Sequence, residues 1–277
     1  MNTIETALKI HSLIDGDSES ALFDAELLLC HVLGCNRTYL RTWPEKQLSS
    51  DQQTQYSSLI NLRREGQPVA YLLGRRDFWT LELFVSPATL IPRPDTEILI
   101  EHALELTLPS DASVLDLGTG TGAIALSLAS ERSNWQVTAC DAFSAVVELA
   151  QKNAEHNRLE RVDIVCSSWF EMFENDRFHL IVSNPPYIDP QDPHLTQGDL
   201  RYEPVSALVA QEQGMADIRH IVQASVKHLY VDGWLMIEHG YDQGGLVRNC
   251  FEQCGFEQIK TICDFGNNER VTMGQMK

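Results

Sequence analysis

The tetrapeptide Asn184-Pro185-Pro186-Tyr187 combines groups that can hold a planar amino group. Asn184 offers a side-chain carbonyl oxygen, and Pro185 offers a backbone carbonyl followed by a residue without an amide N–H. The Tyr187 ring can stack on a flat group. This set suits an amine that is conjugated and poorly nucleophilic, such as a nucleobase amine or a carboxamide. The alternative is a rigid turn that leaves a strand predicted at residues 178–183.

A glycine-rich stretch from Asp116 to Gly122 joins a predicted strand to a predicted helix. Glycine allows the backbone to approach a ligand closely, and a helix N-terminus favours an anionic group. Gly118, Gly120 and Ala123 satisfy the relaxed dinucleotide pattern, and Asp141 follows at roughly the 20-residue distance that suits a ribose diol. The alternative is that Asp141 caps the next helix. This stretch alone leaves nicotinamide cofactors and S-adenosylmethionine open.

Three further features favour S-adenosylmethionine. A carboxylate at Asp116 could bind the cofactor's ammonium group, directly or through water, whereas it would repel a pyrophosphate. The tetrapeptide follows a later strand, where open parallel sheets bind their ligands. The chain also ends in a predicted hairpin over residues 255–274, with a turn at Gly266-Asn267-Asn268, and not in another strand-helix repeat.

Five motifs together resemble one protein family. They are Ile91-Pro92-Arg93-Pro94-Asp95-Thr96-Glu97, Asp116-Leu117-Gly118-Thr119-Gly120-Thr121-Gly122, Ser183-Asn184-Pro185-Pro186-Tyr187-Ile188, Arg201-Tyr202-Glu203-Pro204 and Asn268-Glu269-Arg270-Val271. The chain resembles the HemK/PrmC-type class I methyltransferases, which use S-adenosylmethionine to modify the glutamine of the Gly-Gly-Gln motif in peptide chain release factors. The motifs extend from about Pro68 onward, and DNA and RNA methylases share only the asparagine motif.

The resemblance implies a set of site residues. The implied cofactor-binding residues are Gly118, Thr119, Gly120, Thr121, Gly122, Asp141 on the ribose hydroxyls, Trp169 beside the adenine, and Asn184. Trp169 is equally compatible with a plain core position. Arg93, Asp95 and Glu97 either close over the cofactor or belong to an ordinary helix start. Residues 142–145 depart from the usual start of the helix after Asp141, which leaves the adenine-edge contacts open.

The tetrapeptide supplies the predicted catalytic groups. A carboxamide nitrogen attacks poorly because its lone pair is delocalised into the carbonyl. If the Asn184 side-chain oxygen and the Pro185 carbonyl each accept one N–H, they position that nitrogen and stabilise the charge that develops on it. Tyr187 packs against the flat amide, and Pro186 completes the substrate-binding set. No dedicated base is required.

Composition restricts the possible partners and compartment. The 277 residues, 43% of them hydrophobic, suffice for one large and one small domain. With 21 basic and 39 acidic residues the net charge is −18, which opposes stable nucleic-acid binding. The seven cysteines lack zinc-ligand spacing, so we expect reduced, mostly buried thiols and no metal. A signal-peptide pattern and a long apolar run are absent, which predicts a cytoplasmic protein without membrane contact.

The first 75 residues carry helical periodicity and predict a small helical bundle. We expect this bundle to serve substrate recognition, and the sequence leaves open whether it contacts the release factor or the cofactor domain. Asp24 and Glu26 lie off the predicted apolar face, and Gly34 is the predicted helix stop. A second helix is expected from about residue 50 to 65, capped by Ser50 or Asp51. The apolar face comprises Ala21, Ala25, Leu28, Leu29, Val32 and Leu33.

Strands and helices alternate from Pro92 onward, which predicts a Rossmann-like, parallel, doubly wound α/β sheet. The predicted domains are a helical domain at 1–75, a β-hairpin linker at 76–88 and a methyltransferase domain at 89–277. Residues 188–214 are predicted as a long substrate loop. The expected elements are helix 95–107, strands 113–117 and 136–141, helices 123–130 and 144–157, strands 162–167 and 178–183, helix 215–229, strand 233–238, helix 244–254 and the terminal hairpin.

Three other functions remain alternatives. An amino-methyltransferase acting on a nucleobase of RNA or DNA would use the same tetrapeptide on a flipped or single-stranded base, but it predicts a basic channel. A binding module without activity, or a nicotinamide dehydrogenase, fits the motifs less well. We expect a monomer whose partner is a class I release factor as protein substrate. The sequence leaves the preferred release factor undetermined.

Overall fold

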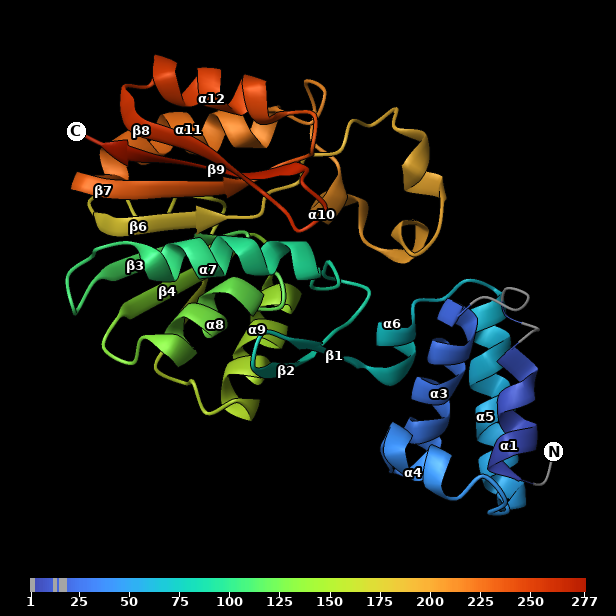
Figure 1. The fold of residues 1–277 in the computed structure, drawn as a ribbon. Coiled ribbons are helices and arrows are strands. Elements are labelled where there is room, and N and C mark those ends of the chain that lie inside the picture. The colour runs from blue at the N-terminus through green and yellow to red at the C-terminus, as the bar shows by residue number, and fades with distance from the viewer. Residues whose placement is uncertain (1–2, 12–13, 15–18) are drawn as a thin grey trace. The chain divides into compact units, whose positions relative to one another are not determined.

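A computed structural model describes residues 3–11, 14 and 19–277. It divides the chain into two compact units, each with its own core (Figure 1). The first comprises the described residues up to Arg75 together with His194–Tyr202. The second comprises Arg76–Pro193 and Glu203–Lys277.

The first unit is a helical bundle, as the apolar periodicity predicts. Gly34, with a φ of +61°, directly follows the helix Glu19–Leu33, which confirms the predicted stop. The cap of the next long helix is Ser49, one residue before the predicted position, because Ser49 and Gln52 form a reciprocal capping box. The elements are α1 (Ile4–Leu8), η1 (Lys9–His11), α3 (Glu19–Leu33), α4 (Arg37–Thr42), α5 (Ser50–Arg64) and α6 (Val69–Leu73).

Two acidic side chains of α3 are buried, although the sequence pattern placed them off the apolar face. Asp24 is 9% exposed and lies 2.8 Å from Arg63 Nε, and Glu26 is 6% exposed and pairs with Arg37 at 2.5 Å. Ion pairing explains this burial, because acidic residues are seldom buried unless they are paired. Periodicity alone does not reveal such partners.

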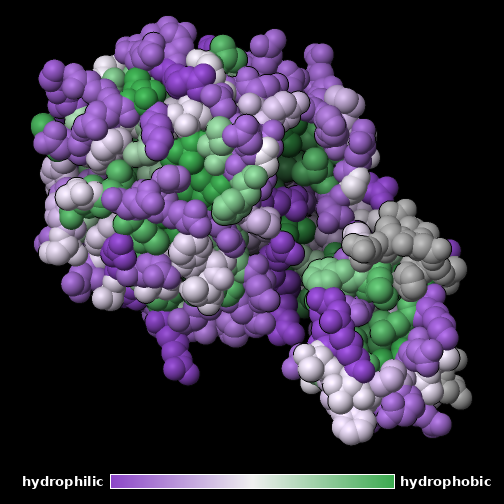
Figure 2. Space-filling view, in the orientation of Figure 1, coloured by the Kyte–Doolittle hydropathy of each residue, from purple (hydrophilic) through white to green (hydrophobic). Residues whose placement is uncertain are grey.

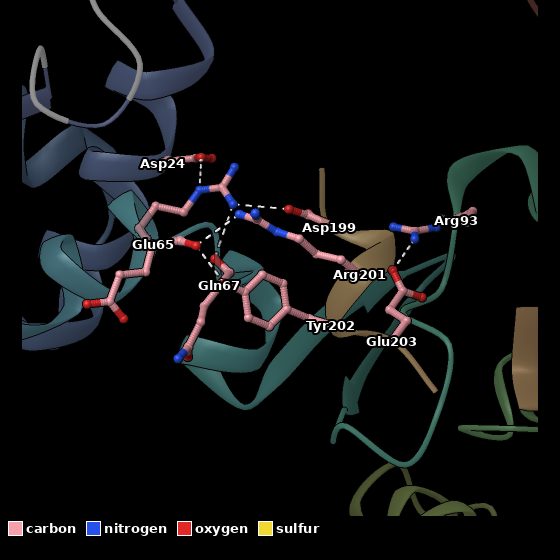
Figure 3. A network of polar contacts seen from close by, with 9 residues as sticks. Asp24, Glu65, Gln67, Arg93, Asp199, Arg201, Tyr202 and Glu203 are labelled. Atoms are coloured by element: carbon pink, nitrogen blue, oxygen red, sulfur yellow. Dashed lines mark hydrogen bonds and ion pairs between the residues drawn. The ribbon is translucent and has the colours of Figure 1, made fainter. Parts of the chain in front are cut away.

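Arg63 and Glu65 also hold part of the distant segment His194–Tyr202 within the helical unit (Figure 3). Arg63 Nη1 donates to Asp199 Oδ1 at 3.0 Å and to the Gln67 carbonyl at 3.1 Å. Arg201 Nη2 and the Tyr202 hydroxyl donate to the Glu65 carbonyl at 2.9 and 2.6 Å. This segment is therefore part of the helical unit's own hydrogen-bond network.

The second unit is built on a seven-stranded sheet with the order β5-β4-β3-β6-β7-β9-β8. β3 to β7 are parallel and β9 runs antiparallel between β7 and β8, which confirms the Rossmann-like sheet and the terminal hairpin. Asn267, in the turn of that hairpin, has a φ of 62°. The strands are β3 (Ser113–Leu117), β4 (Gln136–Asp141), β5 (Asp163–Cys166), β6 (Phe178–Ser183), β7 (Leu229–Glu238), β8 (Phe256–Cys263) and β9 (Glu269–Met276).

Helices cover both faces of this sheet (Figure 1). α7 (Glu97–Glu105), which follows the short η2 (Pro94–Thr96), lies on one face with α8 (Ala123–Glu131) and α9 (Ser144–His156). α11 (Ala216–His228) and α12 (Gly244–Gln253) lie on the other. Because side chains alternate along a strand, Val114 packs in the first core and its neighbour Leu115 in the second.

Residues 188–214 leave the sheet and return to it. Ile188 N donates to Leu208 O at 2.9 Å, and Ala210 N donates to Ile188 O at 3.1 Å. Both ends of the segment are thus hydrogen-bonded within the second unit, although the middle belongs to the first. The segment contains η3 (Pro193–Thr196), η4 (Leu200–Tyr202) and α10 (Val205–Leu208).

The surface is mixed in polarity. On the face that Figure 2 shows, hydrophobic patches are bordered by hydrophilic residues.

Of the seven cysteines, Cys140 and Cys250 are buried and Cys166 and Cys263 are exposed, so the expectation of mostly buried thiols is wrong. Among the described helices, none has the length and apolar character needed to cross a membrane.

A two-stranded sheet, β1 (Arg75–Phe78) and β2 (Leu81–Phe84), precedes the main sheet and is tied to it through Asn153 of α9. Asn153 is fully buried, and its side chain hydrogen-bonds both backbone groups of Phe84, at 2.7 and 3.0 Å. Its amide also donates to Thr121 O at 2.8 Å. One side chain thereby fixes the hairpin beside the glycine-rich loop.

We expect Asn153→Ala to lower the free energy of unfolding by at least about 2 kcal/mol, because it leaves shielded backbone groups without partners. Thermal and urea unfolding followed by circular dichroism measure this loss. Asn249→Ala, on the exposed side of α12, is the matched control and should stay within about 0.5 kcal/mol of the unmodified protein. Equal stability of the two variants would contradict the assigned role of Asn153.

Candidate active site

A cavity of about 300 Å³ lies at the carboxyl ends of the central parallel strands in the second unit. The residues that directly follow β3, β5 and β6 line it, as does the last residue of β4. Strand order reverses at β3, which is where open α/β sheets form ligand crevices. Lining residues include Leu90, Arg93, Thr96, Gly118, Thr119, Gly120, Thr121, Asp141, Phe143, Ser167, Trp169, Asn184, Pro186, Ser206, Ala207 and Asp217.

The glycine-rich loop forms one wall of the cavity. Gly118, Gly120 and Gly122 have φ values of 69°, 56° and 85°, in the left-handed region that other residues rarely adopt. Gly122 is the N-cap of α8 and does not line the cavity, whereas the four residues before it do. The loop thus turns its backbone toward the space that a ligand would occupy.

Asp116 lies behind this loop and does not line the cavity. Its Oδ2 accepts from Thr119 Oγ1 at 2.6 Å and from Ala125 N at 3.2 Å, so the carboxyl holds the turn into α8. Its Oδ1 has no hydrogen-bond partner among the described residues. Complete burial raises the pKa of Asp116 to about 7, although both hydrogen bonds lower it. An ammonium contact through water stays a prediction.

Asp141, the last residue of β4, lines the cavity and stabilises the glycine-rich loop. Its Oδ2 accepts from Gly120 N at 3.1 Å and its Oδ1 from Phe143 N at 3.2 Å. Burial raises the pKa of Asp141 above its ordinary value, and the backbone N–H groups lower it. Each carboxylate oxygen retains acceptor capacity, so Asp141 can stabilise the turn and still receive ribose hydroxyls.

Trp169 follows β5 and lines the cavity with a φ of 48°. Its ring lies 3.4 Å from the position that a Cβ on Gly118 would occupy, so a larger residue there would meet the indole. The ring also packs against the apolar core beneath α11 and α12. Trp169 is therefore both a core residue and part of the cavity wall.

The tetrapeptide begins directly after β6. Asn184 Nδ2 donates to Thr96 Oγ1 at 3.2 Å, and no described residue hydrogen-bonds Asn184 Oδ1. Asn184 and Pro186 line the cavity, while Pro185 is buried and Tyr187 does not line it. The Tyr187 hydroxyl lies 3.4 Å from Glu238 Oε1. Stacking of the Tyr187 ring on a substrate amide stays a prediction.

The backbone after Tyr187 is held from two sides. Gln243 Nε2 donates to Tyr187 O at 2.9 Å and to Gln213 O at 3.1 Å. A Cβ on Gly214, whose φ is +80°, would lie only 1.9 Å from Tyr187 O. Glycine is therefore required at this approach, and the exit of the tetrapeptide is fixed.

The motif before α7 divides its side chains between cavity and scaffold. Arg93 lines the cavity and pairs with the buried Glu203, which also accepts from Ile91 N at 3.2 Å (Figure 3). Asp95 lies 3.6 Å from Arg270, and Glu97 accepts from Trp79 N at 3.0 Å. Of the three residues considered for closure over the cofactor, Arg93 is thus the one at the cavity.

Sequence reasoning did not assign roles to several lining residues or to Glu203, which pairs with the lining residue Arg93. Thr96 and Glu203 lie inside recognised motifs, so their motifs could have signalled them. Ser206, Ala207 and Asp217 come from α10 and the start of α11, where the sequence carries no comparable signal. Only folding brings these residues to the cavity.

Comparison with known proteins identifies the family. Residues 10–74 match the PrmC N-terminal domain, and residues 94–199 match the methyltransferase small domain. Over 258 residues the chain is 52% identical to a release factor glutamine methyltransferase of Escherichia coli, covering 93% of each chain. The chain belongs to the release factor glutamine methyltransferase family. The Pseudomonas aeruginosa enzyme of this name is 51% identical and covers 99% of both chains.

Solved structures agree on the fold of this methyltransferase. A Pyrococcus furiosus methyltransferase superposes with a TM-score of 0.54 at 19% identity, covering 70% of this chain and 88% of its own. The hMettl16 catalytic domain, solved with a MAT2A 3'UTR hairpin, gives a TM-score of 0.59 at 15% identity and covers 86% and 84%. At such identities these likenesses show a shared fold and no more.

The cofactor of this methyltransferase is S-adenosylmethionine. The residues at the cavity fit it: the loop at Gly118–Thr121 offers a close backbone wall, and Asp141 offers acceptors. When the Asp116 carboxyl is ionised, its buried Oδ1, without a partner among the described residues, can supply negative potential toward a cationic ligand. Which residue takes which part of the cofactor stays a proposal.

We expect Asp116→Asn to change the pH dependence of stability. Because burial raises the folded pKa from 3.8 to about 7, the stability associated with the neutral carboxyl is present below pH 3.8 and is lost as pH rises through 7. An asparagine can keep both hydrogen bonds through its oxygen without that charge. Relative to the unmodified protein, the variant should become more stable between pH 5 and pH 8, as measured by thermal unfolding at each pH.

The exposed Asp163 provides the matched control for this measurement. Asp163→Asn makes the same change at an exposed position and measures how the substitution itself affects the melting temperature. If Asp116→Asn behaves in the same way, the buried carboxyl does not titrate as the structure indicates.

Proposed function

We propose that this methyltransferase transfers the methyl group of S-adenosylmethionine to the side-chain amide nitrogen of the glutamine in the Gly-Gly-Gln motif of class I peptide chain release factors. One observation carries the proposal: Asn184, whose amide oxygen has no hydrogen-bond partner among the described residues, lines the same cavity as the glycine-rich loop and Asp141. The identity of 50–52% with curated release factor glutamine methyltransferases over nearly the whole chain supports this choice of substrate.

The proposed site acts by positioning and electrostatics. When bound, the cofactor supplies an electrophilic methyl group on a sulfonium centre. Asn184 Oδ1 and the Pro185 carbonyl each accept one N–H of the substrate amide, which orients the nitrogen and stabilises its developing positive charge. Because the cofactor wall and Asn184 share one cavity, nitrogen and methyl group can be aligned without a large rearrangement.

The charge of the protein supports a protein substrate. A net charge of −18 disfavours a phosphate backbone, and a release factor requires no such contact. We further propose that the enzyme works as a monomer in the cytoplasm, where release factors act. Gly118, Thr119, Gly120, Thr121, Gly122, Asp141, Trp169 and Asn184 are the proposed cofactor-binding residues, and Asn184, Pro185, Pro186 and Tyr187 are the proposed substrate-binding residues.

The first test is a methylation assay on a purified class I release factor with S-adenosylmethionine carrying a labelled methyl group. We expect methylation on the Gly-Gly-Gln glutamine, located by digestion and mass spectrometry, and none when that glutamine is replaced by alanine. Asn184→Ala should lower kcat by about 10²–10³, because one preorganised acceptor is lost. Cofactor affinity, measured by calorimetry, should change much less.

Asn249→Ala is the control for this assay and should retain full activity, since its side chain lies on the exposed face of α12. Transfer to RNA or DNA in parallel reactions, with no methyl on the release factor, would overturn the proposed substrate. Full activity of Asn184→Ala would overturn the proposed mechanism but leave the substrate in place.

A further inference from the structure

Beneath the tetrapeptide lies a buried cluster that connects three distant parts of the second unit. Thr96 ends η2 and is 4% exposed, and Glu238 ends β7 and is 1% exposed. The Thr96 hydroxyl accepts from Asn184 Nδ2 at 3.2 Å. A side-chain hydrogen bond from Thr96 also lowers the pKa of the Glu238 carboxyl, which burial raises. The Tyr187 hydroxyl donates to Glu238 Oε1 at 3.4 Å. Glu238 is therefore linked to both polar side chains of the tetrapeptide.

When Glu238 is ionised, the donor and acceptor properties of this cluster permit one arrangement. An ionised carboxylate can only accept hydrogen bonds, so the Thr96 hydroxyl must donate its single hydrogen to Glu238. The Thr96 oxygen then retains only lone pairs and requires an N–H from Asn184. With its NH₂ group committed to Thr96, Asn184 turns its oxygen toward the cavity.

We propose that Thr96 and Glu238 are positioning residues for methyl transfer, which fix the side-chain amide of Asn184 so that its oxygen accepts from the substrate N–H. The inference rests on the proposed function, in which the Asn184 oxygen accepts a substrate N–H. A reversed amide would instead present its own N–H groups to the substrate N–H groups. Such a reversal removes the acceptor on which the chemistry depends.

The charges around Glu238 suit a retained carboxylate. Arg270 from β9 faces it and carries a buried Nε without a partner among the described residues, and Asp95 from η2 pairs with Arg270 at 3.6 Å. Glu238 Oε2 is likewise buried without a partner. A carboxylate buried with one unpartnered oxygen opposes folding, so stability alone gives no reason for its presence.

The main test compares two substitutions at Thr96. Thr96→Val keeps the shape but removes the hydroxyl, and we expect kcat to fall about 10–100-fold, as a misplaced catalytic group commonly causes. The cofactor KM should change little, because the cavity wall keeps its shape, whereas the melting temperature should fall, because Glu238 and the Asn184 amide lose a hydrogen-bond partner. Thr96→Ser restores the hydroxyl and should restore most of kcat. A wild-type kcat for Thr96→Val would overturn the inference.

Glu238→Gln provides a second test with a signature that a structural role would not give. A glutamine can present either its oxygen or its NH₂ group to Thr96, so it no longer dictates the amide orientation. In the unmodified enzyme, burial raises the pKa of Glu238 to about 7, and the nearby groups Arg270, Asp95 and Tyr187 also contribute to it. We therefore expect kcat to fall as the pH drops below about 7, because Glu238 then becomes protonated. The variant should lack this step and keep or gain thermal stability at pH 8, where the buried charge is removed.

One measurement separates this inference from the proposed substrate. The side-chain NH₂ signals of Asn184 can be identified in nitrogen-15 spectra by their loss in Asn184→Ala. They should shift and exchange faster with solvent in Thr96→Val but not in Thr96→Ser, whether or not a release factor is methylated. Unchanged signals in Thr96→Val would overturn the positioning role even if release factor methylation is observed.

Discussion

The hydrogen bond from Asn184 to Thr96 joins the exit of β6 to the start of α7, and the proposed function of the cavity depends on it. An amide side chain has one accepting and one donating end, and only the accepting end suits a substrate N–H. Because Thr96 takes the donating end, the other end faces the space beside the glycine-rich loop. The rest of the structure holds these groups at the positions that the site requires.

Two buried acids help to hold the glycine-rich loop and the tetrapeptide in place, at a cost in stability. Asp116 shapes the glycine-rich loop from behind, and Glu238 lies beneath the tetrapeptide. Burial raises the pKa of each to about 7, because water no longer solvates the charge. Two carboxyls that oppose folding near neutral pH are expected where a site requires fixed acceptors more than it requires stability.

The segment from Ile188 to Val209 shows how neighbouring residues can serve different units. Arg201 and Tyr202 donate to a carbonyl of the helical unit, whereas the next residue, Glu203, pairs with Arg93 at the cavity wall. The return of the segment then brings Ser206 and Ala207 to the cavity. A stretch without periodicity thus supplies ordered contacts in both units.

The sequence by itself determined the strand-helix alternation, the glycine-rich loop, the terminal hairpin and the tetrapeptide. These features depend on local periodicity and backbone chemistry, so strands such as Ser113–Leu117 and Phe178–Ser183 were predicted with their observed bounds. Only the tertiary structure decided which side chains meet across the fold. Asp24 is buried because Arg63 reaches it, Asp116 is directed behind the loop, and Thr96 lies between Asn184 and Glu238. Such contacts join residues far apart in the chain, and periodicity carries no information about them.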